Sequence, residues 1–368
     1  MDKSLVFCVT NNLRHDQRMI RICTSLQQAG YKVELVGRSV DPTPSLPERP
    51  YKQHLLPCGF RNGKFMYLEY NLRLFFYLIF RKRPDVLVAI DLDTIVPVYL
   101  VSRLRSVGRV YDAHEWFSEM KEVLRRPPIQ SVWKWVERFF VPRFPDGYTV
   151  SHSIAESFEK LYGVHYPVIM NATVLTESPQ IFEKTDQPFL LYQGAVNEGR
   201  CLEYLIPAMR HVGMPLHIYG DGNYLEECRK LIREHSLEQK VLLMGKLDPE
   251  ALQEVTVRAF AGINLVEPLG ANQLMSLANK FFDYIHAGIP QLTMNFPEYR
   301  RINDAFEVAL LIDQPDPVLI TKSLNNLILN PVLYGRLEEN CEKARSVYNW
   351  QEEEKKLKAF YHSYFKRR

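Results

Sequence analysis

The stretch LVFCVTNNLRHDQRMIRICTSLQQAGYKVELVG, residues 5–37, holds the pattern that decides the fold. Residues 5–10 form an apolar run that predicts a strand, residues 17–28 predict an amphipathic helix that Gly30 ends, and residues 32–37 predict a second strand. A helix between two strands is the crossover of a βαβ unit, in which the strands run parallel.

The same alternation continues outward from this unit to about residue 171. A loop with prolines at 42, 44, 47 and 50 comes next. Beyond it the pattern predicts an apolar helix at 65–80, strands at 85–90 and 109–112, and weaker strands at 147–150 and 166–170. Asn171 then opens a segment rich in threonine, serine and proline, which is typical of a domain linker.

The pattern of strands and helices restarts after this linker. It predicts strands at 189–193, 216–219, 240–244, 262–266, 291–294 and 307–312, and helices at 202–210, 224–234, 249–257 and 276–290. Two such arrays predict an α/β protein with two doubly wound, parallel-sheet, Rossmann-like domains, residues 1–172 and 173–348, that face a central cleft. Ligands of such sheets bind at the carboxyl ends of the strands.

Length and composition agree with this organisation. The chain has 368 residues, more than the roughly 250 to 300 at which one core stops growing. The six cysteines include no Cys-x-x-Cys pair, which argues against a zinc site or a disulfide framework and favours the cytoplasm. The first apolar run is too short for the apolar region of a signal peptide, and no run reaches the ~18 apolar residues of a membrane span.

The net charge of +3 is unevenly distributed. Residues 1–170 hold 24 Lys and Arg against 17 Asp and Glu, a balance of +7, and residues 171–368 hold 22 against 26, a balance of −4. A basic first half suits contact of the first domain with an anionic surface, such as the inner face of a membrane, better than contact with nucleic acid.

The helix predicted at 276–290, SLANKFFDYIHAGIP, ends in a Gly-x-Pro stop. Phe281, Tyr284 and Ile285 lie at i, i+3 and i+4 and are expected to bury one face. With Ser276 as the cap, Lys280 lies near the N-terminus and Asp283 one turn deeper. Because a helix N-terminus attracts phosphate, the stretch is either a phosphate site or an ordinary packed helix.

Polar residues follow the first strand and the strand at 85–90. Asp16 and Arg18, close to Arg14, either cap and pair at the start of the helix or contact a ligand. Asp91 and Asp93 form an Asp-x-Asp pattern, which occurs in metal-binding nucleotide-sugar sites but is too common to count alone. Asp93 is also a good N-cap for the apolar stretch that follows, and no metal is expected here.

Other strand ends carry further candidates. Asp112, His114 and Glu115 close the strand at 109–112, and three ionisable groups at one strand end favour a function over a purely structural pair. After the strand at 189–193, Gly194 permits close backbone approach and Arg200 opens a helix, where its guanidinium suits a diphosphate. After the strand at 216–219, Gly220 and Asp221 form a turn that suits a base or a ribose.

Together these segments resemble the family 4 glycosyltransferases, which have the GT-B fold. The resemblance to the donor half of that family lies in YQG (192–194) with Arg200, IYGDG (218–222), residues 241–245, and NKFFDY (279–284) with AGIP (287–290). The resemblance to the acceptor half lies in residues 14–21, 85–93 and 111–115, so it covers nearly the whole chain.

The resemblance implies a retaining transfer of a sugar from a UDP- or GDP-linked donor, without a metal or another cofactor. By position, Arg200 replaces the lysine that holds the diphosphate, Asp283 replaces the ribose carboxylate, and His114 is the histidine that touches the sugar. Lys280 and the N–H groups near Ala278 and Asn279 are expected to stabilise the departing diphosphate. The resemblance also implies that a final helix, within residues 349–368, crosses back to the first domain.

Three positions depart from the family pattern. Ala195 stands where an arginine is expected, Cys201 where a glycine is expected, and Met275 where the first glutamate of Glu-x7-Glu is expected. Lys280 is therefore expected to replace one basic contact, and Glu267, Asn272 or Gln273 the grip on the sugar hydroxyls. Two alternatives stay open: a nucleotide-sugar epimerase or hydrolase of the same fold, and a catalytically silent scaffold that binds nucleotide sugars.

Two segments bear on the acceptor. Residues 64–83 and 125–143 combine many aromatic and apolar side chains with basic ones. Such helices either lie on a membrane surface, which would indicate a lipid-linked saccharide as acceptor, or are core helices with basic ends. The acceptor-side candidates are the strand-end residues of the first half: Arg14, Asp16, Arg18, Asp91, Asp93 and Glu115.

Overall fold

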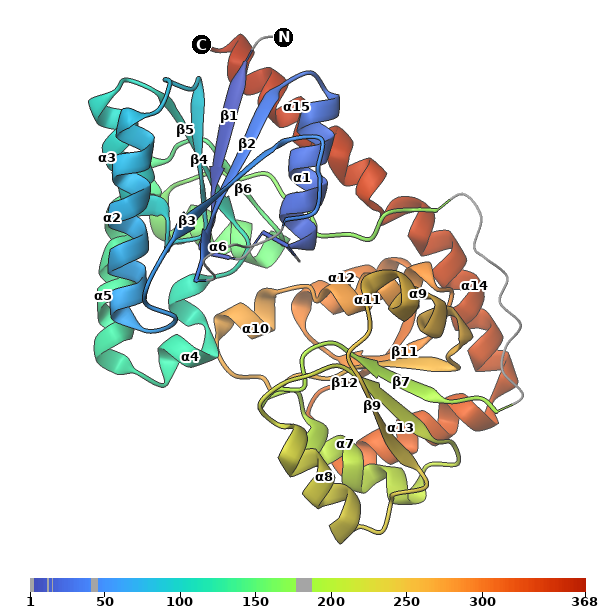
Figure 1. The fold of residues 1–368 in the computed structure, drawn as a ribbon. Helices are drawn as coiled ribbons and strands as arrows, with labels where there is room; N and C mark the ends of the chain where they lie inside the picture. Colours follow the sequence, from blue (N-terminus) through green and yellow to red (C-terminus); the bar gives the residue numbers. More distant parts are fainter. Residues whose placement is uncertain (1–2, 12, 15, 41–45, 177–186) are drawn as a thin grey trace. The chain divides into compact units, whose positions relative to one another are not determined.

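The computed structural model describes residues 3–11, 13–14, 16–40, 46–176 and 187–368 (Figure 1). Residues 41–45 of the proline-rich loop and 177–186 of the predicted linker lie outside this description. The chain divides into two compact units. Unit 1 comprises Met1–Asn171, Gly270–Asn272 and Glu353–Arg368, and unit 2 comprises Ala172–Leu269 and Gln273–Glu352.

Unit 1 is built on a six-stranded parallel sheet in the order β3-β2-β1-β4-β5-β6. Its strands are β1 (Ser4–Cys8), β2 (Lys32–Ser39), β3 (Lys52–Pro57), β4 (Val86–Ile90), β5 (Gly108–Ala113) and β6 (Gly147–Thr149). Its longer helices are α1 (Gln17–Gln28), α2 (Lys64–Phe80), α3 (Ile95–Leu104), α5 (Pro127–Phe140), α6 (His152–Tyr162) and most of α15 (Trp350–Lys366), and α4 (Lys121–Leu124) is a single turn. Helices α2, α3 and α5 cover one face of the sheet, and α1 with α15 covers the other (Figure 1).

Burial explains why these residues form these elements. Every side chain of β4, VLVAI, is buried, as expected for a central parallel strand covered by helices on both faces. Helix α1 starts at Asp16, whose carboxylate accepts the N–H of Met19 at 3.1 Å. Helix α15 packs through the buried Tyr361, whose ring centroid lies 6.3 Å from that of Phe7 and 6.2 Å from that of Tyr31.

Unit 2 repeats the design in the order β12-β11-β10-β7-β8-β9. Its strands are β7 (Leu190–Gln193), β8 (Leu216–Tyr219), β9 (Val241–Gly245), β10 (Ala261–Asn264), β11 (Gln291–Met294) and β12 (Ala309–Ile312). The helices of this half are α7 (Leu202–Ala208), α8 (Leu225–Glu234), α9 (Pro249–Arg258), α10 (Ala271–Met275), α11 (Asn279–His286), α12 (Pro297–Ala305), α13 (Pro317–Leu329) and α14 (Pro331–Val347).

Helix α11 is fixed on this sheet by Tyr284. The hydroxyl of Tyr284 donates to the carbonyl groups of Leu191 at 3.2 Å and Ile263 at 3.3 Å, on two neighbouring strands. Its ring lies so close to β10 that a Cβ on Gly262 would come within 2.3 Å of it. The N-terminus of α11 therefore has a defined position beside the carboxyl ends of β7 and β10.

The predicted α/β class with two parallel, doubly wound sheets is confirmed. The predicted strand at 166–170 is wrong, because that segment makes only an isolated bridge between Thr149 and Val168. Strand β3 was not predicted, since prolines surround it and it lies at the edge of the sheet. Within the part of the chain described above, no helix combines the length and the apolar character needed to cross a membrane.

Two predicted helix caps are also wrong. Helix α11 begins after Ala278, without a side-chain cap, and the hydroxyl of Ser276 donates instead to the carbonyl group of Gln273 at 3.4 Å. Helix α3 begins after Thr94, so Asp93 is not its N-cap.

Candidate functional site

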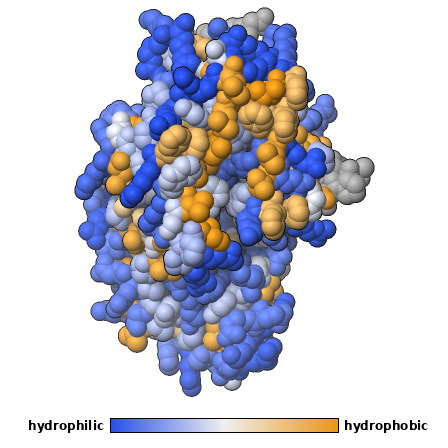
Figure 2. All heavy atoms as spheres, turned by 90° about the vertical axis from the view of Figure 1, so that its left-hand side faces the viewer, coloured by the Kyte–Doolittle hydropathy of each residue, from blue (hydrophilic) through white to orange (hydrophobic). Residues whose placement is uncertain are grey.

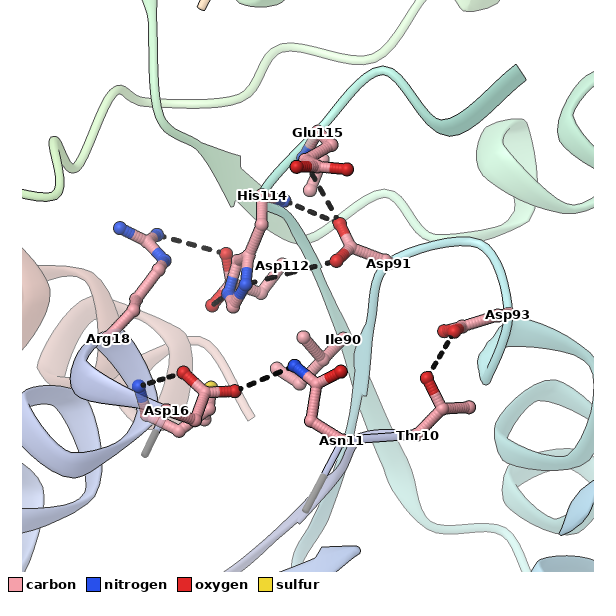
Figure 3. Close-up of polar contacts among 12 residues, drawn as sticks. Thr10, Asn11, Asp16, Arg18, Ile90, Asp91, Asp93, Asp112, His114 and Glu115 are labelled. Atoms are coloured by element: carbon pink, nitrogen blue, oxygen red, sulfur yellow. Dashed lines mark hydrogen bonds and ion pairs between the residues drawn. The ribbon is translucent and has the colours of Figure 1, made fainter. Parts of the chain in front are cut away.

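Asp91 ties the carboxyl end of β4 to the residues that follow β5 (Figure 3). Its backbone lies in the left-handed region, at φ 53°. Its Oδ1 accepts the N–H groups of His114 at 2.8 Å and Glu115 at 3.2 Å. Non-glycine residues rarely adopt this conformation, and strained backbone clusters at functional sites. Asp91 thus fixes the backbone from which His114 projects.

His114 is held by a buried ion pair that joins α1 to β5. Its Nε2 lies 2.8 Å from Oδ2 of Asp112, without the N–H alignment of a regular hydrogen bond. Arg18 contacts the other oxygen of Asp112 at 3.0 Å and donates to the carbonyl group of Ile169 at 3.0 Å. Because Arg18 is 4% exposed and Asp112 is 0% exposed, water cannot replace either partner.

Burial and charge act in opposite directions on this cluster. Burial opposes ionisation of both Asp112 and His114. For Asp112 the charges of Arg18 and His114 outweigh burial, so its pKa is lowered. For His114 the charges of Asp112 and Asp91 outweigh burial and the repulsion from Arg18, so its pKa is raised. Burial raises the pKa of Asp91 to about 8 and the pKa of Asp93 to about 7. The cluster therefore favours a positively charged imidazole beside two carboxyl groups that titrate near neutral pH.

The structure decides between the two alternatives for the residues around α1. Asp16 caps the helix, and its other oxygen accepts from the amide of Asn11 at 3.0 Å. Arg18 turns into the buried pair with Asp112, and its contact with an acceptor stays a prediction. Arg14 is exposed and Glu115 is half-buried, so the surface of this strand end is formed partly by these two side chains.

Asp93 and Asp91 serve separate partners. Asp93 is 8% exposed and accepts the hydroxyl of Thr10 at 2.5 Å, which links the ends of β1 and β4 (Figure 3). Among the residues that the structure describes, no group of three or more His, Cys, Asp or Glu is arranged to hold a metal ion.

In unit 2, the loops after β7 and β8 pack so closely that only glycine fits. A Cβ on Gly220 would lie 1.8 Å from the carbonyl oxygen of Gly194, and a Cβ on Gly222 would lie 2.3 Å from that of Val196. Asp221 closes this turn by accepting the N–H of Gly222 at 2.8 Å. These two loops form one surface beside the N-terminus of α11.

Lys280 lies against this surface. A Cβ on Gly194 would be 3.8 Å from Cε of Lys280, and Nζ lies 3.9 Å from the centroid of the Tyr192 ring. That Nζ is buried and has no hydrogen-bond partner among the described residues. Burial, and then the charge of Arg200, lowers the pKa of Lys280 well below its ordinary value.

Arg200 is the second cation of this cluster. It directly precedes Cys201, the N-cap of α7, and its guanidinium makes no hydrogen bond or ion pair within the described parts of the chain. Its charge acts on Lys280, Tyr192 and Tyr299. Lys280 and Arg200 form no salt bridge among the described residues, and the charge of Asp283 offsets only part of the penalty that burial and Arg200 place on Lys280. An anion that enters between the two basic side chains removes this penalty.

Asp283 already has partners within unit 2. Its Oδ1 accepts the hydroxyl of Thr173 at 2.7 Å, and its Oδ2 accepts the amide of Gln193 at 3.2 Å. Gln193 in turn accepts the hydroxyl of Thr256 at 2.8 Å. This network joins α11, β7 and α9, so any contact of Asp283 with a ribose comes in addition to a structural role.

The other donor-side candidates differ in whether they are exposed to solvent or already hydrogen-bonded within the protein. Asn279, the first residue of α11, is exposed, but the N–H of Ala278 donates to the Tyr299 hydroxyl at 3.1 Å. The N–H of Glu267 donates to the carbonyl group of Gly199 at 3.0 Å and fixes the loop after β10. The Oδ1 of Asn272 accepts the N–H of Trp116 at 2.8 Å, so this side-chain oxygen already has a hydrogen-bond partner.

Sequence reasoning missed the partners that hold these residues. Asp112 was noticed but not chosen, although its i, i+2 spacing to His114 places the two side chains on the same side of an extended segment. Thr173 and Tyr192 carry no local signal, because their partners Asp283 and Lys280 lie far away in the sequence.

Two family models match the chain. The model described as Glycosyltransferase Family 4 matches residues 17–173, and the model described as Glycosyl transferases group 1 matches residues 175–344. No curated protein matches the chain.

Several solved structures share the fold along its full length. Sucrose-phosphate synthase from Thermosynechococcus elongatus is 14% identical, with 100% of each chain covered and a TM-score of 0.81. HepE from Anabaena, in complex with UDP-glucose, is 11% identical, with 98% of this chain and 99% of that chain covered and a TM-score of 0.75. WaaG, a glycosyltransferase involved in lipopolysaccharide biosynthesis, is 14% identical, with 96% and 98% covered and a TM-score of 0.72.

Proposed function

This chain belongs to the glycosyltransferases of family 4 type with the GT-B fold, and from that premise we propose that it transfers a hexose, with retention, from a nucleoside diphosphate to a saccharide or lipid-linked saccharide. The relative in complex with UDP-glucose supports a UDP-linked donor, with a GDP-linked donor as the alternative. The relative involved in lipopolysaccharide biosynthesis supports a lipid-linked acceptor.

The observation that carries this proposal is the pair of unpaired cations in unit 2. The Nζ of Lys280 is buried over the ring of Tyr192 without a hydrogen-bond partner among the described residues, and the charge of Arg200 acts on it. A diphosphate supplies the negative charge and the acceptor oxygens that both side chains lack. The glycine-lined surface at Gly194 and Gly220 lets its oxygens approach the backbone closely.

The same pair explains how transfer is accelerated. When the bond between the anomeric carbon and the diphosphate breaks, its electron pair moves to the diphosphate oxygen, and the negative charge there grows. The Nζ of Lys280 is already buried and Arg200 is half-buried, so we propose that they stabilise this charge more in the transition state than in the bound donor. In this proposal the two cations take the role that a divalent metal has in other transferases.

His114 supplies the proposed sugar contact from unit 1. Asp112 and Arg18 fix its ring, and Asp91 fixes its backbone. A positively charged imidazole with a fixed ring donates hydrogen bonds to a sugar hydroxyl rather than accepting a proton from it. Glu115 and Arg14, at the surface of the same strand end, are the residues that we propose for the acceptor.

A silent nucleotide-sugar-binding scaffold is the second candidate. It is favoured by Ala195 and Met275, which remove two side chains that the family pattern uses, and by the structural partners of Asp283. An epimerase or hydrolase of the same fold would instead turn over the donor without an acceptor.

Calorimetric titration of the purified protein with UDP, GDP and ADP tests the proposal first. We expect one of the three to bind with a dissociation constant below the millimolar range, and binding of none would end the enzyme interpretation. Mass spectrometry with UDP- and GDP-sugars and membrane extract then separates the candidates. A glycosylated acceptor supports transfer, consumption of donor without extract indicates an epimerase or hydrolase, and binding without turnover indicates a scaffold.

A further inference from the structure

Helix α2 carries two apolar stripes, and only one of them packs on unit 1. Met66, Tyr70, Leu74 and Leu78 are buried against the rest of the unit. Phe65, Leu68, Leu72, Phe76 and Phe80 point outward and are 50% to 82% exposed. A surface helix of a globular protein normally places polar side chains on its outer face. The outer stripe of α2 therefore needs an explanation outside the fold of unit 1.

Helix α5 extends this outer stripe. Its side chains Val132, Trp135 and Phe139 are 60%, 62% and 38% exposed, while Val136 and Phe140 are buried. The rings of Tyr67 on α2 and Trp133 on α5 meet edge to face, with centroids 5.5 Å apart, so the two helices are neighbours. Figure 2 shows apolar side chains gathered on the face turned toward the viewer, which is the side of α2, α3 and α5 in Figure 1. We call the outer stripes of α2 and α5 the apolar face.

Basic residues flank the two helices of the apolar face in the sequence, and three of them pair with carboxylates: Arg73 with Glu69, Arg81 with Glu34 and Lys134 with Glu119. Residues 61–83 and 125–143 together hold 11 Lys and Arg and two glutamates. Glu69 accepts the N–H groups of Gly59 and Phe60 and pairs with Arg73, and Glu137 is 1% exposed, so neither adds a free negative charge to the surface. Lys64, near one end of α2, and Lys82, just beyond the other, are both exposed.

We propose that the apolar face docks on a membrane with anionic lipids, with the outer stripes in the headgroup and upper acyl region and the basic residues on the lipid phosphates. Large aromatic and aliphatic side chains with a basic border match the interfacial helices of membrane-surface proteins. A second copy of this chain fits less well, because two such faces would bring their basic borders together. The inference is independent of the proposed transfer reaction.

Sedimentation of the full-length protein with lipid vesicles tests the inference. We expect binding to vesicles of phosphatidylcholine with phosphatidylglycerol, and weaker binding to vesicles of phosphatidylcholine alone. Phe76→Ser with Trp135→Ser should weaken binding by about tenfold or more, because each inserted side chain contributes apolar burial. Lys64→Ala with Lys82→Ala should weaken it by about fivefold per charge, and only for the anionic vesicles.

A matched control lies on unit 2, where Leu329 and Val332 are 79% and 78% exposed on α13 and α14. Leu329→Ser with Val332→Ser should leave vesicle binding unchanged, and circular dichroism verifies that each variant is folded. Equal loss in the control, or wild-type binding by the Phe76 and Trp135 variant, would overturn the proposal. Absence of vesicle binding by the wild type would also overturn it. If the wild type then forms a dimer without lipid, and the Phe76 and Trp135 variant is a monomer, the apolar face belongs to an interface with a second copy.

Discussion

The two strand-end clusters of this protein treat charge in opposite ways. In unit 1, the Arg18 guanidinium, the Asp112 carboxylate and the His114 ring satisfy one another inside the protein. In unit 2, Lys280 and Arg200 are neighbours that form no salt bridge among the described residues, and the charge of Asp283 offsets only part of the penalty on Lys280. One cluster is complete without a ligand, and the other is not.

This difference indicates that the cluster in unit 1 positions a residue, whereas the cluster in unit 2 suits the binding of a ligand. A buried ion pair costs desolvation but fixes geometry, which suits the positioning of His114. An unpaired, desolvated cation destabilises the empty protein and strengthens binding of an anion, which suits a leaving group. The predictions below change one cluster at a time and proceed from the largest expected effect to the smallest.

Replacing Asp112 should give the largest effect. Asp112→Asn leaves Arg18 buried without its counter-charge, and we expect the free energy of unfolding to fall by about 3 to 5 kcal/mol. Urea denaturation measures this loss. Adding Arg18→Met should recover part of it, because the orphaned charge is then removed as well. A loss below about 1 kcal/mol for Asp112→Asn would mean that the pair does not stabilise unit 1.

Replacing Arg200 should change the rate of transfer more than the stability. Arg200→Ala is expected to lower the rate about a hundredfold or more, which is the usual cost of losing one charge that stabilises a leaving group. The initial rate with the donor found by screening measures the effect. Arg210→Ala is the matched control, because Arg210 is an exposed arginine near the end of the same helical segment. Near wild-type rates for Arg200→Ala would remove Arg200 from the site.

Replacing Lys280 should stabilise the empty protein. Lys280→Met keeps the length and apolar body of the side chain but removes the desolvated amine, so the free energy of unfolding should rise by about 1 kcal/mol or more in the absence of ligand. The same variant should bind nucleoside diphosphate more weakly. A loss of stability in urea denaturation would show that Lys280 supports the fold instead.

The two clusters should also give opposite pH slopes of stability. The folded-state pKa values of Asp91 and Asp93 are raised to about 8 and about 7, and that of His114 is raised as well. The stability that these groups contribute below their ordinary pKa values is therefore lost as pH rises through the raised ones. The pKa of Lys280 is lowered, so its penalty fades as pH rises toward its ordinary 10.5. Urea denaturation at about pH 6 and about pH 9 measures how much the free energy of unfolding falls between the two pH values. Relative to the wild type, this fall should be smaller for Asp91→Asn and larger for Lys280→Met. Parallel slopes for all three proteins would refute this assignment.

Most of the fold could be predicted from the sequence, because it rests on local patterns. The helix at 17–28 and the strands at 216–219 and 291–294 have the bounds that apolar periodicity predicted. Strand β3 could not be predicted, since an edge strand among prolines shows little alternation. The segment 166–170 failed for the opposite reason: it has strand-like residues but only one bridge to β6.

The candidate site was predictable in its residue types but not in their partners. His114, Arg200 and Lys280 stand out as charged residues at strand ends and helix starts, and the family resemblance supplied their expected roles. Arg18 pairs with Asp112, which lies 94 residues away in the sequence, and Asp283 accepts a hydrogen bond from Thr173, which lies 110 residues away. No local pattern carries such contacts, and for that reason the sequence left capping and ligand binding open for Asp16 and Arg18.

The most direct test of the central claim is the proton uptake that accompanies binding of a nucleoside diphosphate. Titration calorimetry at about pH 8.5, in buffers that differ in ionisation enthalpy, counts the protons bound with the tightest of UDP, GDP and ADP. If the pKa of Lys280 is lowered in the empty site, the negative charge of the diphosphate raises it again, so the amine binds a proton when the ligand binds. The wild type should then take up a measurable fraction of a proton, and Lys280→Met should not. Binding with equal proton uptake in both proteins would contradict the account.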